Sequence, residues 1–276
     1  MRSRLIVVNQ ESCYAISVMW ASTIFKAFFV LLCAVTLAAC SDGSDFHLDI
    51  GYSATAQAEA TAYDLNIEQN QVWNDLDPDG EAAVNNYPFL RIRDGTLALF
   101  ETYESYRDVV KYFSMPEIFT TEWDHTVWDE LEVVQSSPTK VHLAGLYSRI
   151  NKDGDTYLTT QTLRIVTLQS GQWGIKVRST YPLATPIEIS NIAEKEIVSA
   201  ESAARNILEK YIEARNNRGM EDLAELHHYP SVVLPSVDLQ LFNAPEDYIT
   251  YEENTVMHNL DYAEWDHSKL NLVEVI

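Results

Sequence analysis

Residues 87–134 read YPFLRIRDGTLALFETYESYRDVVKYFSMPEIFTTEWDHTVWDELEVV, and residues 229–276 read YPSVVLPSVDLQLFNAPEDYITYEENTVMHNLDYAEWDHSKLNLVEVI. Laid over each other without a gap, at a constant offset of 142 residues, the two stretches are identical at about 14 positions. The tetrapeptide EWDH recurs within them, at 122–125 and at 264–267. A match of this length predicts an internal duplication, so that the chain carries two copies of one folding unit.

The second copy is shorter than the first. Its last residue, Ile276, corresponds to Val134, so residues 135–181 of the first copy have no counterpart. We therefore expect a complete first unit (residues 55–181), a linker (182–198) and an incomplete second unit (199–276). A truncated reading frame explains this better than the alternative, in which a partner chain supplies the missing strands.

Charge and composition exclude several classes of function. The chain has 276 residues and a formal net charge of −22, and a surface this acidic would repel phosphate backbones and anionic lipid surfaces. The sequence shows no cluster of His, Cys and Asp at metal-ligand spacing and no glycine-rich phosphate loop. We therefore expect no nucleic-acid partner, no metal and no organic cofactor.

The amino terminus resembles a secretion signal. After Lys26 comes an apolar run, residues 27–37, which is short for a membrane span and suits the core of a signal peptide. The run ends in Leu-Ala-Ala-Cys at residues 37–40, which resembles the lipobox of bacterial lipoproteins. The resemblance implies a signal peptide over residues 1–39, with Met19 as an alternative start. An uncleaved hydrophobic anchor is the competing interpretation.

Lipidation at Cys40 would set the location of the protein. We expect a periplasm-facing protein of the bacterial cell envelope, which contacts the membrane only through the lipid on Cys40. Ser41 follows that cysteine, and by resemblance to lipoprotein sorting it favours the outer membrane. The small, polar residues up to residue 54 would serve as a tether.

The first unit shows a regular order of elements. Apolar residues at helical spacing predict a helix over residues 55–76, and Asp77-Pro78 predicts the cap and first turn of a short second helix. A small hairpin (89–92 and 97–102) and a third helix (104–113) follow. Alternating patterns and turn signals then predict four antiparallel strands, at 123–134, 140–150, 157–168 and 173–181. The second unit begins in the same order, with helices from residue 199.

This order of elements resembles the NTF2-like superfamily, which includes ketosteroid isomerase and the SnoaL-like proteins. The resemblance rests on Asn86-Tyr87-Pro88 after the helix pair, on Trp123-Asp124-His125 at the start of the four strands, and on residues 171–175, GQWGI, in the last strand. It implies an α+β fold in which three helices pack on a curved antiparallel sheet and form a cone. This scaffold hosts enzymes, binding modules and structural domains, so fold alone does not give function.

Strand alternation selects candidate residues inside the cone. Period two places Trp123 and His125 on the side of Leu131, and it places Trp173 on the face opposite Lys176 and Arg178. An NTF2-like cone encloses a pocket between sheet and helices, and the predicted lining is Trp123, His125, Tyr147 and Trp173. Aromatic walls and one imidazole suit a small apolar molecule with a single polar group. Plain core packing of these side chains is the competing interpretation.

We interpret the protein as a non-catalytic binding or interaction module. Its expected partners are a small apolar molecule in the first cone and, as the resemblance implies, a second copy through the face of the sheet. The alternative is a cofactor-independent isomerase, dehydratase or hydrolase of the ketosteroid-isomerase type, which needs a carboxylate inside the cone. Alternation turns Glu122 and Asp124 away from it, and it separates Asp124 from His125 unless a bulge intervenes. A cone filled by its own side chains is a third interpretation.

Overall fold

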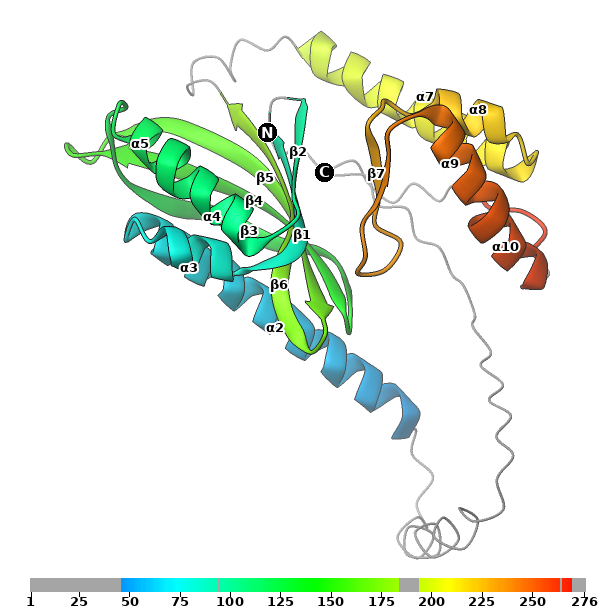
Figure 1. Ribbon diagram of the computed structural model, residues 1–276, viewed down its shortest axis with the longest axis horizontal. Helices are drawn as coiled ribbons and strands as arrows, with labels where there is room; N and C mark the ends of the chain where they lie inside the picture. The colour runs from blue at the N-terminus through cyan, green and yellow to red at the C-terminus, as the bar shows by residue number, and fades with distance from the viewer. Residues whose placement is uncertain (1–45, 94, 184–193, 264, 270–276) are drawn as a thin grey trace, which may run out of the picture.

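The computed structural model describes residues 46–93, 95–183, 194–263 and 265–269 (Figure 1). The signal segment, Cys40, residues 41–45 of the tether and the last seven residues lie outside this range. Residues 46–54, which we predicted as part of the tether, belong to a helix instead. Within the described part of the chain, no helix is both long and apolar enough to cross a membrane.

The first unit begins with a helix pair. Helix α2 (Phe46–Asn74) is longer than predicted, and Ala58 and Ala62 on one of its faces are buried. Helix α3 (Pro78–Ala83) begins as the sequence predicts, because the Asp77 side chain accepts a hydrogen bond from the backbone N–H of Asp79 at 3.1 Å. The Asp77 cap fixes where α3 begins, and the buried alanines mark the face of α2 that packs on the rest of the unit.

Six strands form one curved sheet in the order β2-β1-β6-β5-β4-β3. Strands β1 and β6 are parallel, and the other neighbours are antiparallel. The strands are β1 (Asn85–Arg93), β2 (Thr96–Phe100), β3 (Trp123–Ser137), β4 (Lys140–Asn151), β5 (Thr156–Gln169) and β6 (Gln172–Leu183). Gly154 and Gly171 take positive φ angles in the two predicted hairpin turns. The four long strands thus lie where alternation predicted them.

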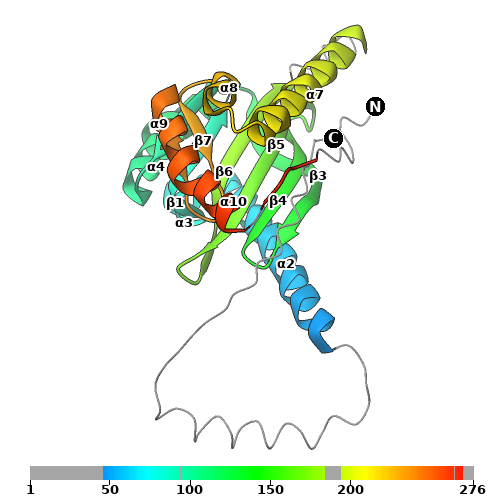
Figure 2. The same ribbon diagram turned by 90° about the vertical axis from the view of Figure 1, so that its right-hand side faces the viewer.

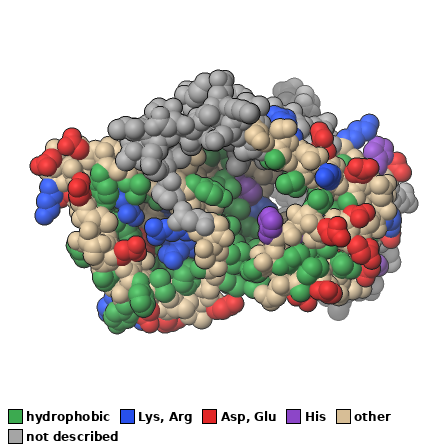
Figure 3. All heavy atoms as spheres, turned by 90° about the horizontal axis from the view of Figure 1, so that it is seen from above, with side chains coloured by type: hydrophobic (Ala, Val, Ile, Leu, Met, Phe, Trp, Pro, Cys, Tyr) green, Lys and Arg blue, Asp and Glu red, His purple; other side chains and the backbone are tan. Residues whose placement is uncertain are grey.

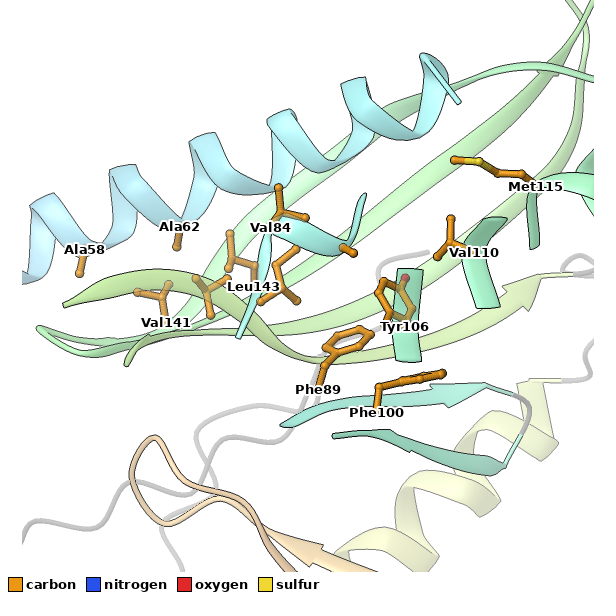
Figure 4. Packing of buried hydrophobic residues seen from close by; sticks show 13 residues of the cluster. Ala58, Ala62, Val84, Phe89, Phe100, Tyr106, Val110, Met115, Val141 and Leu143 are labelled. Carbon is orange, nitrogen blue, oxygen red and sulfur yellow. The ribbon is translucent and has the colours of Figure 1, made fainter. Parts of the chain in front are cut away.

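Helical segments α4 (Tyr103–Val109), η1 (Val110–Ser114) and α5 (Met115–Ile118) run on from one another and cover the sheet together with α2 and α3 (Figure 1). Three aromatic rings hold them to it: the ring centroid of Tyr106 lies 4.8 Å from that of Phe89 and 5.0 Å from that of Phe100 (Figure 4). The α+β cone that the resemblance implied is therefore confirmed for the first unit.

The second unit has its own small core, in which Leu223, Phe242 and Tyr248 are buried. Its elements are α7 (Glu194–Asn216), α8 (Met220–Glu225), β7 (Ser231–Val233), β8 (Gln240–Phe242), α9 (Pro245–Tyr251), η2 (Glu252–Met257) and α10 (His258–Tyr262). Helices α8 and α9 have the bounds of α3 and α4 shifted by 142 residues. The strand expected from Trp265 onward is not formed at residues 265–269, and residues 270–276 lie outside the described range.

The second unit lies on the side of the six-stranded sheet that faces away from α2 (Figures 1 and 2). A hydrogen bond between described residues joins the units directly: the Lys140 ammonium on β4 donates to the backbone carbonyl of Leu234 at 3.1 Å. The outer face of the first unit's sheet is thus contacted by its own chain.

Candidate functional site: an arginine-lined cavity

A cavity of about 130 Å³ lies inside the cone of the first unit. Its walls come from α2, from the α4–η1–α5 segment and from the strands β1, β3, β4, β5 and β6. The position is the one that the resemblance implied. The chemistry of the walls differs from the apolar pocket that we predicted.

Arginines dominate the lining. Residues 55–181 contain six arginines, and five of them line the cavity: Arg91, Arg93, Arg149, Arg164 and Arg178. The sixth, Arg107, pairs with its neighbour Asp108 outside the cavity. Glu117 is the acidic residue of the lining. On the face drawn in Figure 3, acidic side chains gather most densely over the second unit, whereas five of the six arginines of the first unit line its cavity.

Three of these arginines form a row across adjacent strands. Arg91 on β1 is the register partner of Arg178 on β6, and Arg178 is the register partner of Arg164 on β5. Register partners project from the same face of a sheet, so three guanidinium groups converge on one interior surface. Like charges in directly opposed positions destabilise a sheet unless counter-charge is supplied. We call these three residues the arginine row.

The row exists because of a β-bulge. Ile175 pairs with Val166 and Val177 pairs with Ile165, which leaves Lys176 as the extra residue in β6. Simple alternation put Arg178 on the outer face with Lys176. The bulge shifts the alternation by one, so Arg178 faces inward like Ile175. Our placement of Arg178 was therefore wrong.

One buried carboxylate neutralises part of the row. The Glu81 side chain is completely buried and accepts hydrogen bonds from Arg178 Nη1 at 3.0 Å, from the Tyr106 hydroxyl at 3.0 Å and from Gln69 Nε2 at 2.6 Å. Arg178 Nη2 also donates to the Tyr106 hydroxyl, at 2.6 Å. Burial raises the pKa of Tyr106, and the Glu81 charge acts in the same direction. Glu81, Tyr106 and Arg178 therefore satisfy one another as a closed network.

Arg164 has no such counter-charge. It is 3 % exposed, and its hydrogen bond among the described residues goes from Nη1 to the neutral Oε1 of Gln69, at 2.5 Å. Its Cζ lies 4.8 Å from the centre of the Trp128 ring, while its Nε is buried without a hydrogen-bond partner. Burial, and then the charge of Arg178, lower the pKa of Arg164 to about 10, so it stays charged at neutral pH. Burial and Arg178 lower the pKa of Arg91 in the same way.

Of the four predicted pocket residues, Tyr147 lies in the cavity wall, where its ring packs edge-on against Trp128 at 5.7 Å. Trp123, His125 and Trp173 are not part of that wall. Trp123 is buried against Trp73, and Trp173 packs on the outside of the core cluster. These three placements correct our prediction.

Bulges in β3 explain the corrections on that strand. The register shifts between Trp123 and His125, and again between Trp128 and Glu130. Thr126 and Trp128 therefore reach the cavity, whereas the His125 side chain is 43 % exposed, with Nδ1 3.0 Å from an oxygen of Asp124. Asp124 and His125 do meet, as the bulge allows, but outside the cone.

Sequence reasoning missed the residues that dominate the site: the arginine row, Gln69 and Glu81. A signal was present, because Arg91 and Arg164 each lie between two apolar residues of a strand, in Leu-Arg-Ile. An arginine that interrupts a strand buried on both faces has to find an interior partner.

Comparisons with known proteins find similar folds only among solved structures. No protein-family model matches the sequence, and a search of curated proteins gives no match. Among solved structures, the chain is similar to a cystatin-like protein of unknown function from Nostoc punctiforme, with 12 % identity and a TM-score of 0.41 over 48 % of this chain and 97 % of that one.

Two further solved structures are similar over a comparable share of the chain. An NTF2-like protein of unknown function from Shewanella oneidensis has 15 % identity and a TM-score of 0.35, over 45 % of this chain and 98 % of that one. A ketosteroid isomerase-like protein from Erwinia carotovora atroseptica has 18 % identity and a TM-score of 0.36, over 45 % and 94 %. Similarities at identities this low concern the fold and give no information about function, which has to be argued from the site.

Proposed function

We propose that the NTF2-like first unit is a binding module that takes up a small, negatively charged molecule in its arginine-lined cavity. The observation that carries this proposal is the buried Arg164, whose charge has no carboxylate partner among the described residues. A buried and unpaired ion costs several kcal/mol, and a bound anion would supply the missing counter-charge. The same anion would offset the repulsion within the arginine row.

Binding is better supported than catalysis. Chemistry of the ketosteroid-isomerase type needs a carboxylate that is free to take a proton inside the cavity. Glu81 already accepts three hydrogen bonds, and the imidazole of His125 lies outside the cavity wall. Glu117 is the remaining acidic group in the lining, so a proton-transfer mechanism has one candidate base and no assembled partner for it.

The decisive experiment is calorimetric titration of the protein with matched pairs of anions and neutral analogues, such as acetate with acetamide and benzoate with benzamide. We expect at least one anion to bind and to raise the melting temperature, while its amide does neither. Arg164→Gln should abolish the response. Arg107→Gln removes the one arginine of this unit outside the cavity and should leave it intact. Anion binding that survives in Arg164→Gln would refute this site.

The apolar ligand expected from the sequence is the direct competitor. If a neutral apolar compound binds inside the cone as well as any anion does, the five arginines of the lining are not what selects the ligand. Running both classes in one panel decides between them.

The location of the protein is a second part of the proposal. The resemblance of residues 37–40 to a lipobox supports lipidation of Cys40 and anchorage in the bacterial envelope, facing the periplasm. These residues lie outside the described range. Expression in a bacterial host with labelled palmitate tests the proposal: wild type should carry label and partition with the outer membrane, and Cys40→Ser should do neither.

Self-association through the outer face of the sheet is the remaining expectation. The bond from Lys140 to Leu234 shows that the second unit already contacts part of this face. Light scattering after gel filtration measures the mass directly. A dimer that Lys140→Glu converts to a monomer would support the proposal, and a monomer at all concentrations would remove it.

A further inference from the structure

The cavity contains features that narrow the ligand further. We infer that it is a monocyclic aromatic carboxylate, with its carboxylate on Arg164 and its ring against the sides of Trp128 and Tyr147 that line the cavity. This inference rests on the proposed function and adds to it the shape of the ligand and the way in which it lies.

Arg164 offers a free edge for a carboxylate. A guanidinium binds a carboxylate best through two parallel N–H groups. In Arg164, Nη1 is used by Gln69, whereas Nε is buried and has no partner. Arg178 is already committed to Glu81 and Tyr106. The unsatisfied charge in this part of the row therefore belongs to Arg164, with Arg91 close enough to add attraction.

Aromatic surface lies next to that edge. Trp128 stacks over the Arg164 guanidinium and meets Tyr147 edge-on, and both rings line the cavity. The indole N–H of Trp128 donates to the backbone carbonyl of Asn66 at 3.3 Å, so its polar atom is satisfied elsewhere. Trp128 therefore presents carbon surface, on which a planar ring gains the offset or edge-on contacts that aromatic pairs prefer.

The size of the cavity limits the ring system. Its volume of about 130 Å³ is close to the roughly 150 Å³ of an engineered apolar cavity that binds benzene. One six-membered ring fits a space of this size, whereas a fused tetracyclic skeleton such as a steroid does not. The walls therefore favour a ligand of benzoate size, with one charged end and one flat, apolar end.

Four probes separate the elements of this inference: benzoate, cyclohexanecarboxylate, acetate and benzamide. Titration of the full chain should give at least tenfold tighter binding for benzoate than for cyclohexanecarboxylate or acetate, and no binding of benzamide. Trp128→Leu should bring benzoate affinity to within about threefold of cyclohexanecarboxylate. Arg164→Gln should weaken both ring acids at least tenfold, and Arg107→Gln should change neither.

The outcomes distinguish this inference from the proposed function. If acetate or cyclohexanecarboxylate binds as tightly as benzoate, the aromatic ligand is refuted and anion binding stands. If no anion binds a protein whose circular dichroism and melting curve are native, both are refuted. If Trp128→Leu unfolds, Tyr147→Leu gives the same comparison from the other ring, and an unchanged preference for benzoate in that variant would also refute the inference.

Discussion

The two units place a buried tyrosine at equivalent positions and surround it with different charges. Tyr106 in the first unit and Tyr248 in the second are 142 residues apart, and each donates its hydroxyl proton to a buried carboxylate that also binds an arginine. In the first unit, Glu81 comes from α3 and the arginine from the sheet. In the second, Glu252 comes from η2, and Arg215 comes from the long helix α7.

The difference lies in the balance of charge. In the second unit, Nη2 of Arg215 binds both oxygens of Glu252, at 2.9 and 3.0 Å, so one cation meets one anion. In the first unit, Glu81 pairs with Arg178, and the cavity lining holds five arginines against one further carboxylate, that of Glu117. A shared scaffold therefore carries a closed ion pair in one unit and an open cationic site in the other. The surplus of cation, more than the fold, is what supports the proposed binding site.

Removing the buried carboxylate of each network should have the largest effect on stability. The loss should be larger in the first unit than in the second. Glu81→Gln leaves Arg178 without its buried anion, beside the two other arginines of the row, and should cost the first unit about 3–5 kcal/mol. Glu252→Gln leaves one arginine and should cost the second unit less. Hydrogen exchange followed by mass spectrometry reports each unit separately. Equal losses in the two units would contradict the idea of a charge surplus, as would a failure of benzoate or sulfate to restore stability to Glu81→Gln.

Acid should destabilise both units, through different histidines. Burial, and then the charge of Lys140, lower the pKa of His142 to about 4, so between about pH 6.5 and 4 the unfolded chain binds a proton that the folded chain excludes. Stability should therefore fall as the pH drops through that window, by on the order of 2 kcal/mol. Burial and Arg215 lower the pKa of His227 in the second unit, which gives a slope of the same sign.

The control for this pH dependence is available in the chain. His142→Gln should flatten the slope of the first unit and leave that of the second, while His227→Gln should do the reverse. Denaturant titrations at pH 4.5 and 7 measure the difference, and a slope that survives in His142→Gln would show that other groups cause it.

Sequence reasoning recovered the fold because its signals are local. The Asp77-Pro78 cap, the glycine turns and the alternation of the strands each act within a few residues, and the elements lie where those signals placed them. The site depended on bulges in β3 and β6. A bulge adds one residue to a strand for reasons of packing on the neighbouring strand, and every side chain beyond it changes face. Trp128 and Arg178 entered the cavity in this way, and His125 left it.

One asparagine in each unit makes the same two backbone hydrogen bonds, and this pair tests the proposed duplication through a smaller expected change in stability. Asn74 exchanges two hydrogen bonds with the backbone of Thr126, both at 2.9 Å, and Asn216 exchanges the same two with Ser268, at 3.0 and 2.8 Å. Both partners lie 142 residues apart, which supports descent from one ancestral unit. Asn216→Ala should cost the second unit about 2 kcal/mol, because it leaves two backbone groups unsatisfied.

The first unit has an additional hydrogen bond at this place, which the second unit lacks. Asn70 also donates to the Thr126 carbonyl, at 3.0 Å, and its counterpart in the second unit is Ile212. Asn74→Ala should therefore cost only about 1 kcal/mol, and the full loss should need Asn70→Ala as well. Denaturant midpoints of the two single variants check this, and a larger loss in Asn74→Ala than in Asn216→Ala would contradict it.

The two tyrosine hydroxyls allow the most detailed comparison of the two networks. Tyr106→Phe removes a donor from Glu81 and an acceptor from Arg178, whereas Tyr248→Phe removes a donor from Glu252, which keeps both bonds from Arg215. The first substitution should therefore cost about 2 kcal/mol and the second about 1 kcal/mol. Because the hydroxyl of Tyr106 disperses charge in the arginine row, its loss should also strengthen anion binding, and that gain has no equivalent at Tyr248. Calorimetry on Tyr106→Phe thus distinguishes a tyrosine that only stabilises the fold from one that also adjusts the charge of the cavity. A lower stability with unchanged anion affinity would show that Tyr106 has the structural role alone.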